Sequence, residues 1–291
     1  MNINDKLNEY KGLIDEQLGV YLSGHPGLVG EAMRYSLLSG GKRVRGILCL
    51  LTAEMFDGDM EQALIAACAV EMLHCYSLIH DDLPCMDNDD FRRGVPSCHK
   101  KFNETIAVLA GDGLLTEAFA VLSQLKDAAA AKNCMSVLSH AAGNQGMIHG
   151  QELDTLEQTL ESDEIRAYLN EVNLLKTGAL IEASVLMGYH TTNRHNEEEV
   201  HALSNYALQL GVVFQLVDDI LDHVSTFEVL GKPIDSDESN HKVTYFTLDG
   251  EEKTRKQAKQ MTQAAVDSLS QFGEAASDLR QYAYQLCERV Q

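Results

Sequence analysis

Two runs of aspartate, each placed after an apolar segment, are the strongest chemical signal in the sequence. The first reads HDDLPCMDNDD at 80–90 and the second reads VDDILD at 217–222. Carboxylates at the end of a core-facing segment are costly unless cations or a metal ion compensate their charge. Magnesium commonly binds a couple of carboxylates together with the phosphates of a substrate. The two runs therefore predict a site for magnesium and a phosphorylated substrate.

The spacing within each run predicts how its carboxylates are presented. Asp218 and Asp222 are four residues apart, which places both on one face of a helix, where they repel each other unless a cation lies between them. Pro84 cannot continue a helical hydrogen-bond ladder, so the helix should loosen there and let Asp87 turn back toward Asp81. On antiparallel helices the two runs would face one cleft.

Basic residues stand beside glycines and beside the acidic runs at four places. These are Lys42-Arg43-Val44-Arg45 after Gly40-Gly41, Arg92-Arg93 before Gly94, Lys176 before Thr177-Gly178, and Lys232 after Gly231. The chain has 23 Lys+Arg against 44 Asp+Glu, a formal net charge of −21, so such groups are not expected of a random surface. Beside two metal sites, they predict a pocket for an anion of diphosphate size.

Other interpretations of the acidic residues fit the sequence less well. A solvated acidic surface does not account for the apolar turns that precede both runs. Glu71-x-x-His74 and Glu198-x-x-His201 have the spacing of di-iron carboxylate bundles. However, Glu198 falls in the first turn of its helix, where the helix dipole favours an exposed carboxylate. A calcium loop starting at Asp87 lacks the required glycine, because Arg92 stands at its sixth position.

The elements that carry these residues are predicted to be helices. None of the four prolines lies between 97 and 232, and in 198–222 apolar residues recur at three- and four-residue steps. Helix starts are indicated by the capping residues Asp59, Ser162 and Asn196. We expect an all-α fold of about ten helices in one domain, 1–291. The predicted helices are 3–22, 28–38, 43–56, 60–83, 104–124, 127–150, 162–188, 196–224, 251–270 and 274–289, with loops at 84–100 and 225–245.

Charge, hydropathy and cysteine content exclude several function classes. A net charge of −21 repels phosphate backbones and anionic headgroups, so we expect no nucleic-acid partner and no stable membrane insertion. The most apolar stretch, Ala63 to His80, contains Glu71 and His74 and predicts a buried core helix. Seven scattered cysteines without a C-x-x-C pair, and a polar segment at 1–8, predict a reduced, cytoplasmic protein.

The motifs resemble those of the short-chain trans-isoprenyl diphosphate synthases, most nearly the bacterial farnesyl-forming enzymes (geranyltranstransferases) and their geranylgeranyl-forming relatives. The matching stretches are GGKRVRG at 40–46, EMLHCYSLIHDDLPCMDNDDFRRGVPSCH at 71–99, LAGDGLLTEAF at 109–119, GNQGMIHGQELD at 143–154, LKTGALI at 175–181, FQLVDDILD at 214–222 and GK…D…KVTY at 231–245. The resemblance implies an isoprenoid synthase fold, helices around a central cavity, a homodimer, and head-to-tail condensation of isopentenyl diphosphate with an allylic diphosphate.

The resemblance also implies a role for individual residues. It implies magnesium ligands at Asp81, Asp82 and Asp87 and at Asp218, Asp219 and Asp222, with three Mg²⁺ ions bridged by the allylic diphosphate. It implies an isopentenyl diphosphate site of Lys42, Arg45, His74 and Arg93. It implies an allylic diphosphate site of Arg92, Lys176 and Lys232, and it places Thr177, Gln215 and Gln151 near the developing carbocation.

Four places depart from the family pattern. The second loop has Pro233-Ile234-Asp235-Ser236-Asp237 and Thr244-Tyr245-Phe246 where a glycine-containing turn and TYP are usual, and Leu175 and His149 replace common His and Gly. These changes bear on how the allylic diphosphate is seated and leave the reaction class unchanged.

We expect farnesyl diphosphate as the main product, with geranylgeranyl diphosphate as the alternative. A terpene cyclase would not need the GGKR segment, and a regulatory subunit should have lost carboxylates from one run. Tyr76 lies five residues before Asp81, ~7.5 Å along a helix at 1.5 Å per residue. The resemblance makes a bulky residue near this position the floor for the growing chain, whereas helix geometry places Ser77 more directly beneath Asp81.

Overall fold

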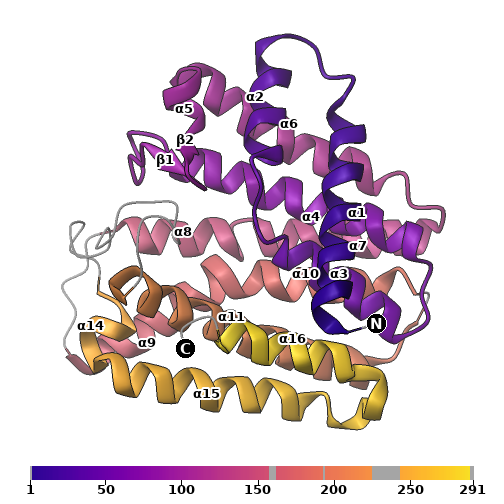
Figure 1. The fold of residues 1–291 in the computed structure, drawn as a ribbon, viewed down its shortest axis with the longest axis vertical. Coiled ribbons are helices and arrows are strands. Elements are labelled where there is room, and N and C mark those ends of the chain that lie inside the picture. Colours follow the sequence, from indigo (N-terminus) through magenta and orange to yellow (C-terminus); the bar gives the residue numbers. More distant parts are fainter. Residues whose placement is uncertain (1, 157–161, 193, 225–242, 289–291) are drawn as a thin grey trace. The chain divides into compact units, whose positions relative to one another are not determined.

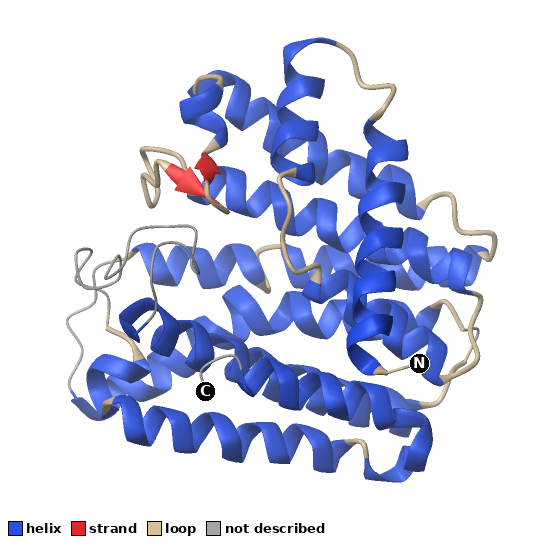
Figure 2. Ribbon diagram, viewed as in Figure 1, coloured by secondary structure: helices blue, strands red, loops and turns tan. Residues whose placement is uncertain are grey.

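The chain is almost wholly helical in a computed structural model that describes residues 2–156, 162–192, 194–224 and 243–288 (Figure 1). Within these residues the strands are β1 (Phe91–Arg92) and β2 (Val95–Pro96), two residues each, which pair antiparallel (Figure 2). The predicted all-α fold class is confirmed.

By their contacts, the residues form two compact units. The first comprises Met1–Ser136 with Met187–Arg194, and the second comprises Val137–Leu186 with His195–Gln291. Two helices, α7 (Ala128–Ala142) and α10 (Ala179–His190), contribute residues to both units. The single domain predicted for 1–291 stays a prediction.

The first unit is a bundle around one apolar helix, α4. Its helices are α1 (Ile3–Leu22), α2 (Gly27–Leu38), α3 (Val44–Met55), α4 (Met60–Asp81), α5 (Cys98–Lys101) and α6 (Glu104–Leu122). Helix α4 packs against α1, α2, α3 and α6. It begins at the predicted cap, because the Asp59 carboxylate accepts from the N–H groups of Glu61 and Gln62.

Three helices are long and apolar enough to cross a membrane when judged by length and composition alone: Met60–Asp81, Glu104–Leu122 and Glu197–His223. In α4, 67% of the most apolar window is buried inside the protein. The prediction of a buried core helix for Ala63 to His80 therefore agrees with the structure. In α6 the corresponding share is 39%, which leaves an apolar surface that includes Val108 and Leu109.

The second unit is arranged around α11 (Glu197–Val224). Its other elements are α8 (Met147–Thr155), α9 (Ser162–Asn173), a π-helical turn η1 (Leu174–Gly178), α14 (Tyr245–Asp249), α15 (Glu251–Ser268), a 3₁₀ segment η2 (Ser270–Ala276) and α16 (Ser277–Glu288). Helix α11 packs against η1, α15 and α16, and its apolar residues Val213, Leu216 and Val217 lie in a buried core cluster. The predicted cap Asn196 accepts from the N–H groups of Glu198 and Glu199.

Two predicted helices were wrong in extent. The helix predicted at 127–150 breaks between α7 and α8, where a Cβ on Gly146 would lie 2.2 Å from the Ala141 carbonyl oxygen. This close approach of backbone to backbone is open only to glycine. The helix predicted at 162–188 is interrupted by η1, where the hydrogen bonds widen to the π pattern. The predicted loops at 84–100 and 225–245 also hold short elements, namely the β1–β2 hairpin, α5 and the start of α14.

Candidate active site

The segment that joins α2 to α3 is a strained turn that presents basic residues. Gly40 and Gly41 have φ of 100° and 122°, and Arg43 has φ of 50°, so three of four consecutive residues lie in left-handed backbone regions. For arginine this conformation costs about 1–2 kcal/mol, and such strain persists only where surrounding contacts hold it. Lys42 is exposed on this turn, and Arg45 is buried in the first turn of α3.

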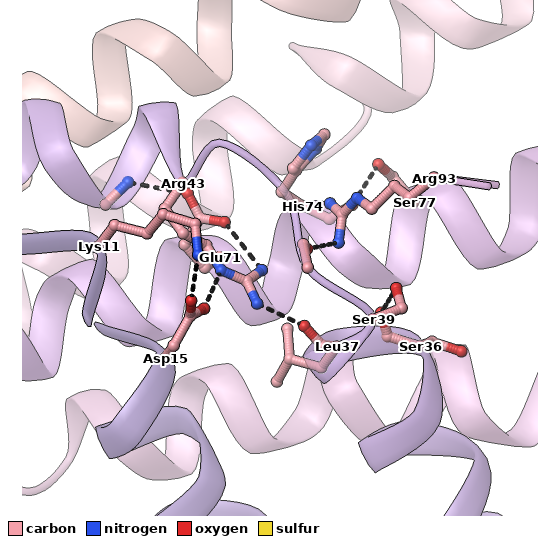
Figure 3. A network of polar contacts seen from close by, with 12 residues as sticks. Lys11, Asp15, Ser36, Leu37, Ser39, Arg43, Glu71, His74, Ser77 and Arg93 are labelled. Carbon is pink, nitrogen blue, oxygen red and sulfur yellow. Dashed lines mark hydrogen bonds and ion pairs between the residues drawn. The ribbon is translucent and has the colours of Figure 1, made fainter. Parts of the chain in front are cut away.

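Arg93 docks against the same turn from the hairpin. Its Nη1 donates to the Gly40 carbonyl, and a Cβ on Gly41 would lie 2.9 Å from its Cζ, so the guanidinium lies directly against the glycine backbone (Figure 3). Burial and the nearby guanidinium groups of Arg45 and Arg93 hold the pKa of His74 well below its usual value. Arg45, His74 and Arg93 of the predicted set all belong to the first unit, where both guanidinium groups help to lower the pKa of His74.

The first aspartate run folds back on the end of α4. The Asp87 N–H donates to the Asp81 carbonyl at 2.8 Å, so the return predicted from Pro84 is present in the backbone. Arg92 donates from Nε to Asp82 Oδ1 at 2.9 Å and from Nη2 to Asp89 Oδ2 at 3.0 Å. Burial raises the pKa of Asp82 to about 6, against the opposing effect of the Arg92 guanidinium.

The donors of both runs are carboxylate oxygens, the hard ligands that magnesium prefers. In the described part of the chain, no three His, Cys, Asp or Glu side chains gather closely enough to hold a metal ion.

The second aspartate run is fixed within α11 by a polar chain. Gln215 donates from Nε2 to Asp219 Oδ1 at 2.9 Å, and the Tyr245 N–H donates to Asp219 Oδ2 at 3.1 Å. Asp219 and Asp222 are buried, whereas Asp218 is half-buried. Asp219 is therefore oriented by two donors, one from its own helix and one from the start of α14.

The π-helical turn η1 presents Lys176 and Thr177. Lys176 Nζ lies 2.6 Å from Asp154 Oδ2 of α8, and Thr177 Oγ1 donates to Gln215 Oε1 at 3.5 Å. Two glycines allow this turn to contact its neighbours through backbone. A Cβ on Gly150 would lie 2.3 Å from the Lys176 nitrogen, and a Cβ on Gly211 would lie 2.6 Å from the Gly178 Cα.

Three other predicted residues are placed as follows. Tyr76 is buried in α4, with its ring edge-to-face against His80 at 5.6 Å, and Ser77 Oγ donates to the His74 carbonyl at 2.9 Å. The Gln151 side-chain oxygen in α8 is buried and accepts no hydrogen bond from the described residues. Lys232 and the altered positions 233–237 lie outside the described residues.

The comparisons identify the family. Residues 26–283 match the description of polyprenyl synthetases. The chain belongs to the polyprenyl synthetase family. Its helical structure agrees with that of solved relatives, so the expected isoprenoid synthase fold is confirmed. This polyprenyl synthetase is therefore a trans-prenyltransferase that makes prenyl diphosphates.

Individual relatives differ in their named products. A dimethylallyltranstransferase of Fischerella ambigua is 42% identical over 282 residues, covering 96% of this chain and 81% of its own. A geranylgeranyl diphosphate synthase of Cyanophora paradoxa is 40% identical, covering 96% and 93%. A geranyltransferase of Helicobacter pylori, solved with magnesium and isoprenyl diphosphate, is 32% identical with a TM-score of 0.81, covering 97% of this chain and 96% of that chain.

Sequence reasoning assigned no site role to Glu71, Asp154 and Tyr245, and it grouped Arg43 with the basic residues of the anion pocket, whereas the structure pairs Arg43 with Asp15, Leu37 and Glu71. Arg43 and Glu71 pair beneath the Lys42–Arg45 turn, Asp154 holds Lys176, and Tyr245 fixes Asp219. Glu71 stood out only as half of a Glu-x-x-His pair, and Asp154 only as the last residue of the GNQGMIHGQELD stretch. Their partners lie far along the chain, so spacing gave no signal for the pairing.

Proposed function

We propose that this trans-prenyltransferase condenses isopentenyl diphosphate with dimethylallyl and geranyl diphosphates and forms mainly farnesyl diphosphate. The docking of the Arg93 guanidinium on the Gly40-Gly41 turn, which carries the exposed Lys42 and leads into the buried Arg45, carries the proposal. In a protein of net charge −21 such a cluster is suited to a small dianionic or trianionic ligand. The first aspartate run and Arg92 follow within the same unit.

The two proposed anion sites differ in what happens to their ligand. Lys42, Arg45, His74 and Arg93 hold the diphosphate of isopentenyl diphosphate, which does not leave. Arg92, Lys176 and Lys232 hold the allylic diphosphate, whose negative charge grows as the C–O bond breaks. Donors aimed at growing charge stabilise the transition state more than the ground state.

Magnesium is the proposed cofactor, and three ions per site bridged by the allylic diphosphate are part of this proposal. The ligands would be Asp81, Asp82 and Asp87 and also Asp218, Asp219 and Asp222. When bound, magnesium neutralises charge on the departing diphosphate. The relative from Helicobacter pylori solved with magnesium supports magnesium as the cofactor. Thr177 and Gln215 would face the allylic cation, and their hydrogen bond to each other fixes the direction of both dipoles.

Tyr76 is proposed to limit product length. Its ring is 6% exposed and rests edge-on against His80, and His80 Nε2 lies 3.1 Å from the Val108 carbonyl of α6. A carbonyl only accepts, so His80 donates from Nε2, which fixes the ring against which Tyr76 packs. Geranylgeranyl diphosphate is the alternative product, because the relative from Cyanophora paradoxa is named for it.

One assay tests the proposed function. The pure protein is incubated with isopentenyl and dimethylallyl diphosphates and Mg²⁺, and the products are identified by chain length. We expect C15 product, no product with a chelator, and return of product when Mg²⁺ is restored. No condensation at all would contradict the reaction, whereas a C20 product would contradict only the farnesyl assignment.

Two variants test whether Tyr76 limits the length of the product. Tyr76→Ala removes an aromatic ring and should shift product from C15 toward C20 or longer. Tyr189→Leu, a change at another buried tyrosine in α10, should lower stability and leave product length unchanged. A folded, active Tyr76→Ala protein with unchanged product would place the floor elsewhere.

A homodimer and a cytoplasmic location complete the proposal. The exposed apolar side chains Val108 and Leu109 of α6, 40% and 46% exposed, support a second copy as the partner of that face. The seven cysteines are free thiols, six of them buried, which suits a reducing compartment.

A further inference from the structure

Arg43 stands between two residues proposed to bind isopentenyl diphosphate, yet its side chain is directed away from them. Lys42 is exposed, whereas Arg43 is 2% exposed and points into the interior between α1 and α4 (Figure 3). A buried arginine in an anion-binding motif needs an explanation, because a guanidinium is rarely buried unless its donors are satisfied.

The Arg43 guanidinium joins three helices. Nε donates to Asp15 Oδ1 of α1 at 2.7 Å, and Nη2 donates to the carbonyl of Leu37 in α2 at 2.6 Å. Nη1 lies 3.5 Å from Glu71 Oε2 of α4. Asp15 and Glu71 thus place a carboxylate on two sides of the Arg43 guanidinium, and the Asp15 carboxylate also accepts from Lys11 Nζ at 2.6 Å (Figure 3).

Glu71 holds the other side of the same turn. Its Oε1 accepts from the Gly46 N–H at 2.9 Å, which satisfies a donor in the first turn of α3. Arg43 is the N-cap residue of α3 and makes no side-chain cap hydrogen bond. The carboxylate from α4 therefore supplies the cap that the sequence of α3 lacks. Glycine at 46 allows this close contact, because a Cβ there would lie 2.8 Å from Ile14 Cδ1 and 3.2 Å from Glu71 Cγ.

We infer that Arg43 and Glu71 are positioning residues for isopentenyl diphosphate: together they hold the left-handed turn in the one conformation that directs Lys42 and Arg45 to a common anion. Arg43 at φ of 50° is strained, and the hydrogen bonds to Asp15 and Leu37 together with the ion pair to Glu71 are the contacts that keep it there. The inference rests on the proposed function, since it needs isopentenyl diphosphate to be the ligand of Lys42 and Arg45.

The test measures the KM for each substrate, and kcat, in variants of Arg43 and Glu71. Arg43→Lys keeps the charge but loses the planar fork, so it cannot serve all three partners. Glu71→Gln keeps an acceptor for the Gly46 N–H but loses the charge. We expect each variant to raise the KM for isopentenyl diphosphate about tenfold or more, with the KM for the allylic substrate and kcat at saturation within about threefold of the unchanged protein.

A double variant provides a folded protein in which the KM can be measured if the single variants do not fold. Replacing one partner of a buried ion pair leaves the other charge uncompensated, which is strongly destabilising, whereas replacing both is much less so. Arg43→Met combined with Glu71→Gln should therefore fold and still show the raised KM for isopentenyl diphosphate. Arg34→Met is the matched control. Its guanidinium binds the carbonyls of Leu22 and His25 in the same unit, away from the turn. It should lower the melting temperature and leave both KM values unchanged.

Three outcomes overturn the inference. The first is a KM for isopentenyl diphosphate that stays within twofold of the unchanged protein in the folded variants. The second is an equal rise of the KM values for both substrates. The third is that all Arg43 and Glu71 variants fail to fold while Arg34→Met folds. The last outcome would make the network a matter of stability alone. Absence of condensation by the unchanged protein would instead contradict the proposed function, and it is measured first.

Discussion

At the scale of single residues, carboxylates already hold the two described cations that are proposed for the allylic diphosphate. Arg92 is fixed by Asp82 and Asp89, and Lys176 is fixed by Asp154. These pairs lower the entropy lost when a diphosphate binds, because the long side chains are already ordered. The site proposed for isopentenyl diphosphate is organised differently, since there the backbone turn is held and Lys42 is exposed on it.

This difference leads to a kinetic prediction. Lys42→Ala or Arg45→Ala should mainly raise the KM for isopentenyl diphosphate, because these residues bind a group that does not leave. Lys176→Ala should instead lower kcat by ~10²-fold, because charge grows on the diphosphate that it holds. Steady-state kinetics with each substrate varied in turn measure both effects. The same kinetic change in both sets would show that the two sites are not distinct.

The neutral His74 gives a prediction for pH dependence. Its pKa is lowered in the folded protein, so the unfolded chain takes up a proton near pH 6.5 that the folded chain refuses. Stability from this group is present above pH 6.5 and is lost as the pH falls below it, because protonation of the unfolded chain then favours unfolding. Without metal or substrate, His74→Gln should lose less stability between pH 7.5 and 5.5 than the unchanged protein does. Equal losses in urea titrations would contradict this.

At the scale of elements, the π turn η1 is set by its neighbours as well as by its own residues. Gly150 of α8 and Gly211 of α11 let two helices touch its backbone, and Asp154, four residues after Gly150, binds Lys176. Helix α14 acts similarly for the second aspartate run, because the N–H of its first residue, Tyr245, donates to Asp219. The short elements η1 and α14, packed closely against their neighbours, thus fix the positions of Lys176 and Asp219.

Gly150→Ala tests this arrangement. The new Cβ would lie 2.3 Å from the Lys176 nitrogen, so the backbone that carries Lys176 and Thr177 must move. A displacement of about 1 Å at reacting groups can cost ~10²-fold in rate, and we expect kcat to fall by that order.

Gly12→Ala in α1 is the control, because nothing lies within 4 Å of its new Cβ and alanine is the better helix former. It should raise stability by about 0.5–1 kcal/mol and leave kcat unchanged. A normal kcat in a folded Gly150→Ala protein would show that the turn tolerates the shift.

At the scale of the whole molecule, the exposed apolar face of α6 leads to a prediction about assembly. Leu109→Asp places a charge on the face proposed to meet a second copy, so it should convert a dimer to a single chain. Val20→Asp, at a residue of α1 that is 59% exposed, is the matched control and should leave the dimer intact. Light scattering measures the mass of each. A dimer that survives Leu109→Asp would place the interface on another face.

The sequence by itself determined the features that depend on local order. Helix class followed from the three- and four-residue periodicity, and the starts at Asp59 and Asn196 followed from side chains that cap within three residues. The return of Asp87 toward Asp81 followed from Pro84 in the same segment. The aspartate runs and the family could also be recognised from the sequence, because the residues that define them lie in short contiguous motifs.

Only the tertiary structure decided which basic and acidic residues face a ligand and which face each other. Arg43 is adjacent to Lys42 in sequence, but it turns inward because its partners, 28 residues before it at Asp15 and 28 after it at Glu71, lie on other helices. The break before Gly146 and the π turn at 174–178 likewise depend on backbone contacts. Such contacts arise from packing between elements, and residue spacing along one element carries no record of what packs against it.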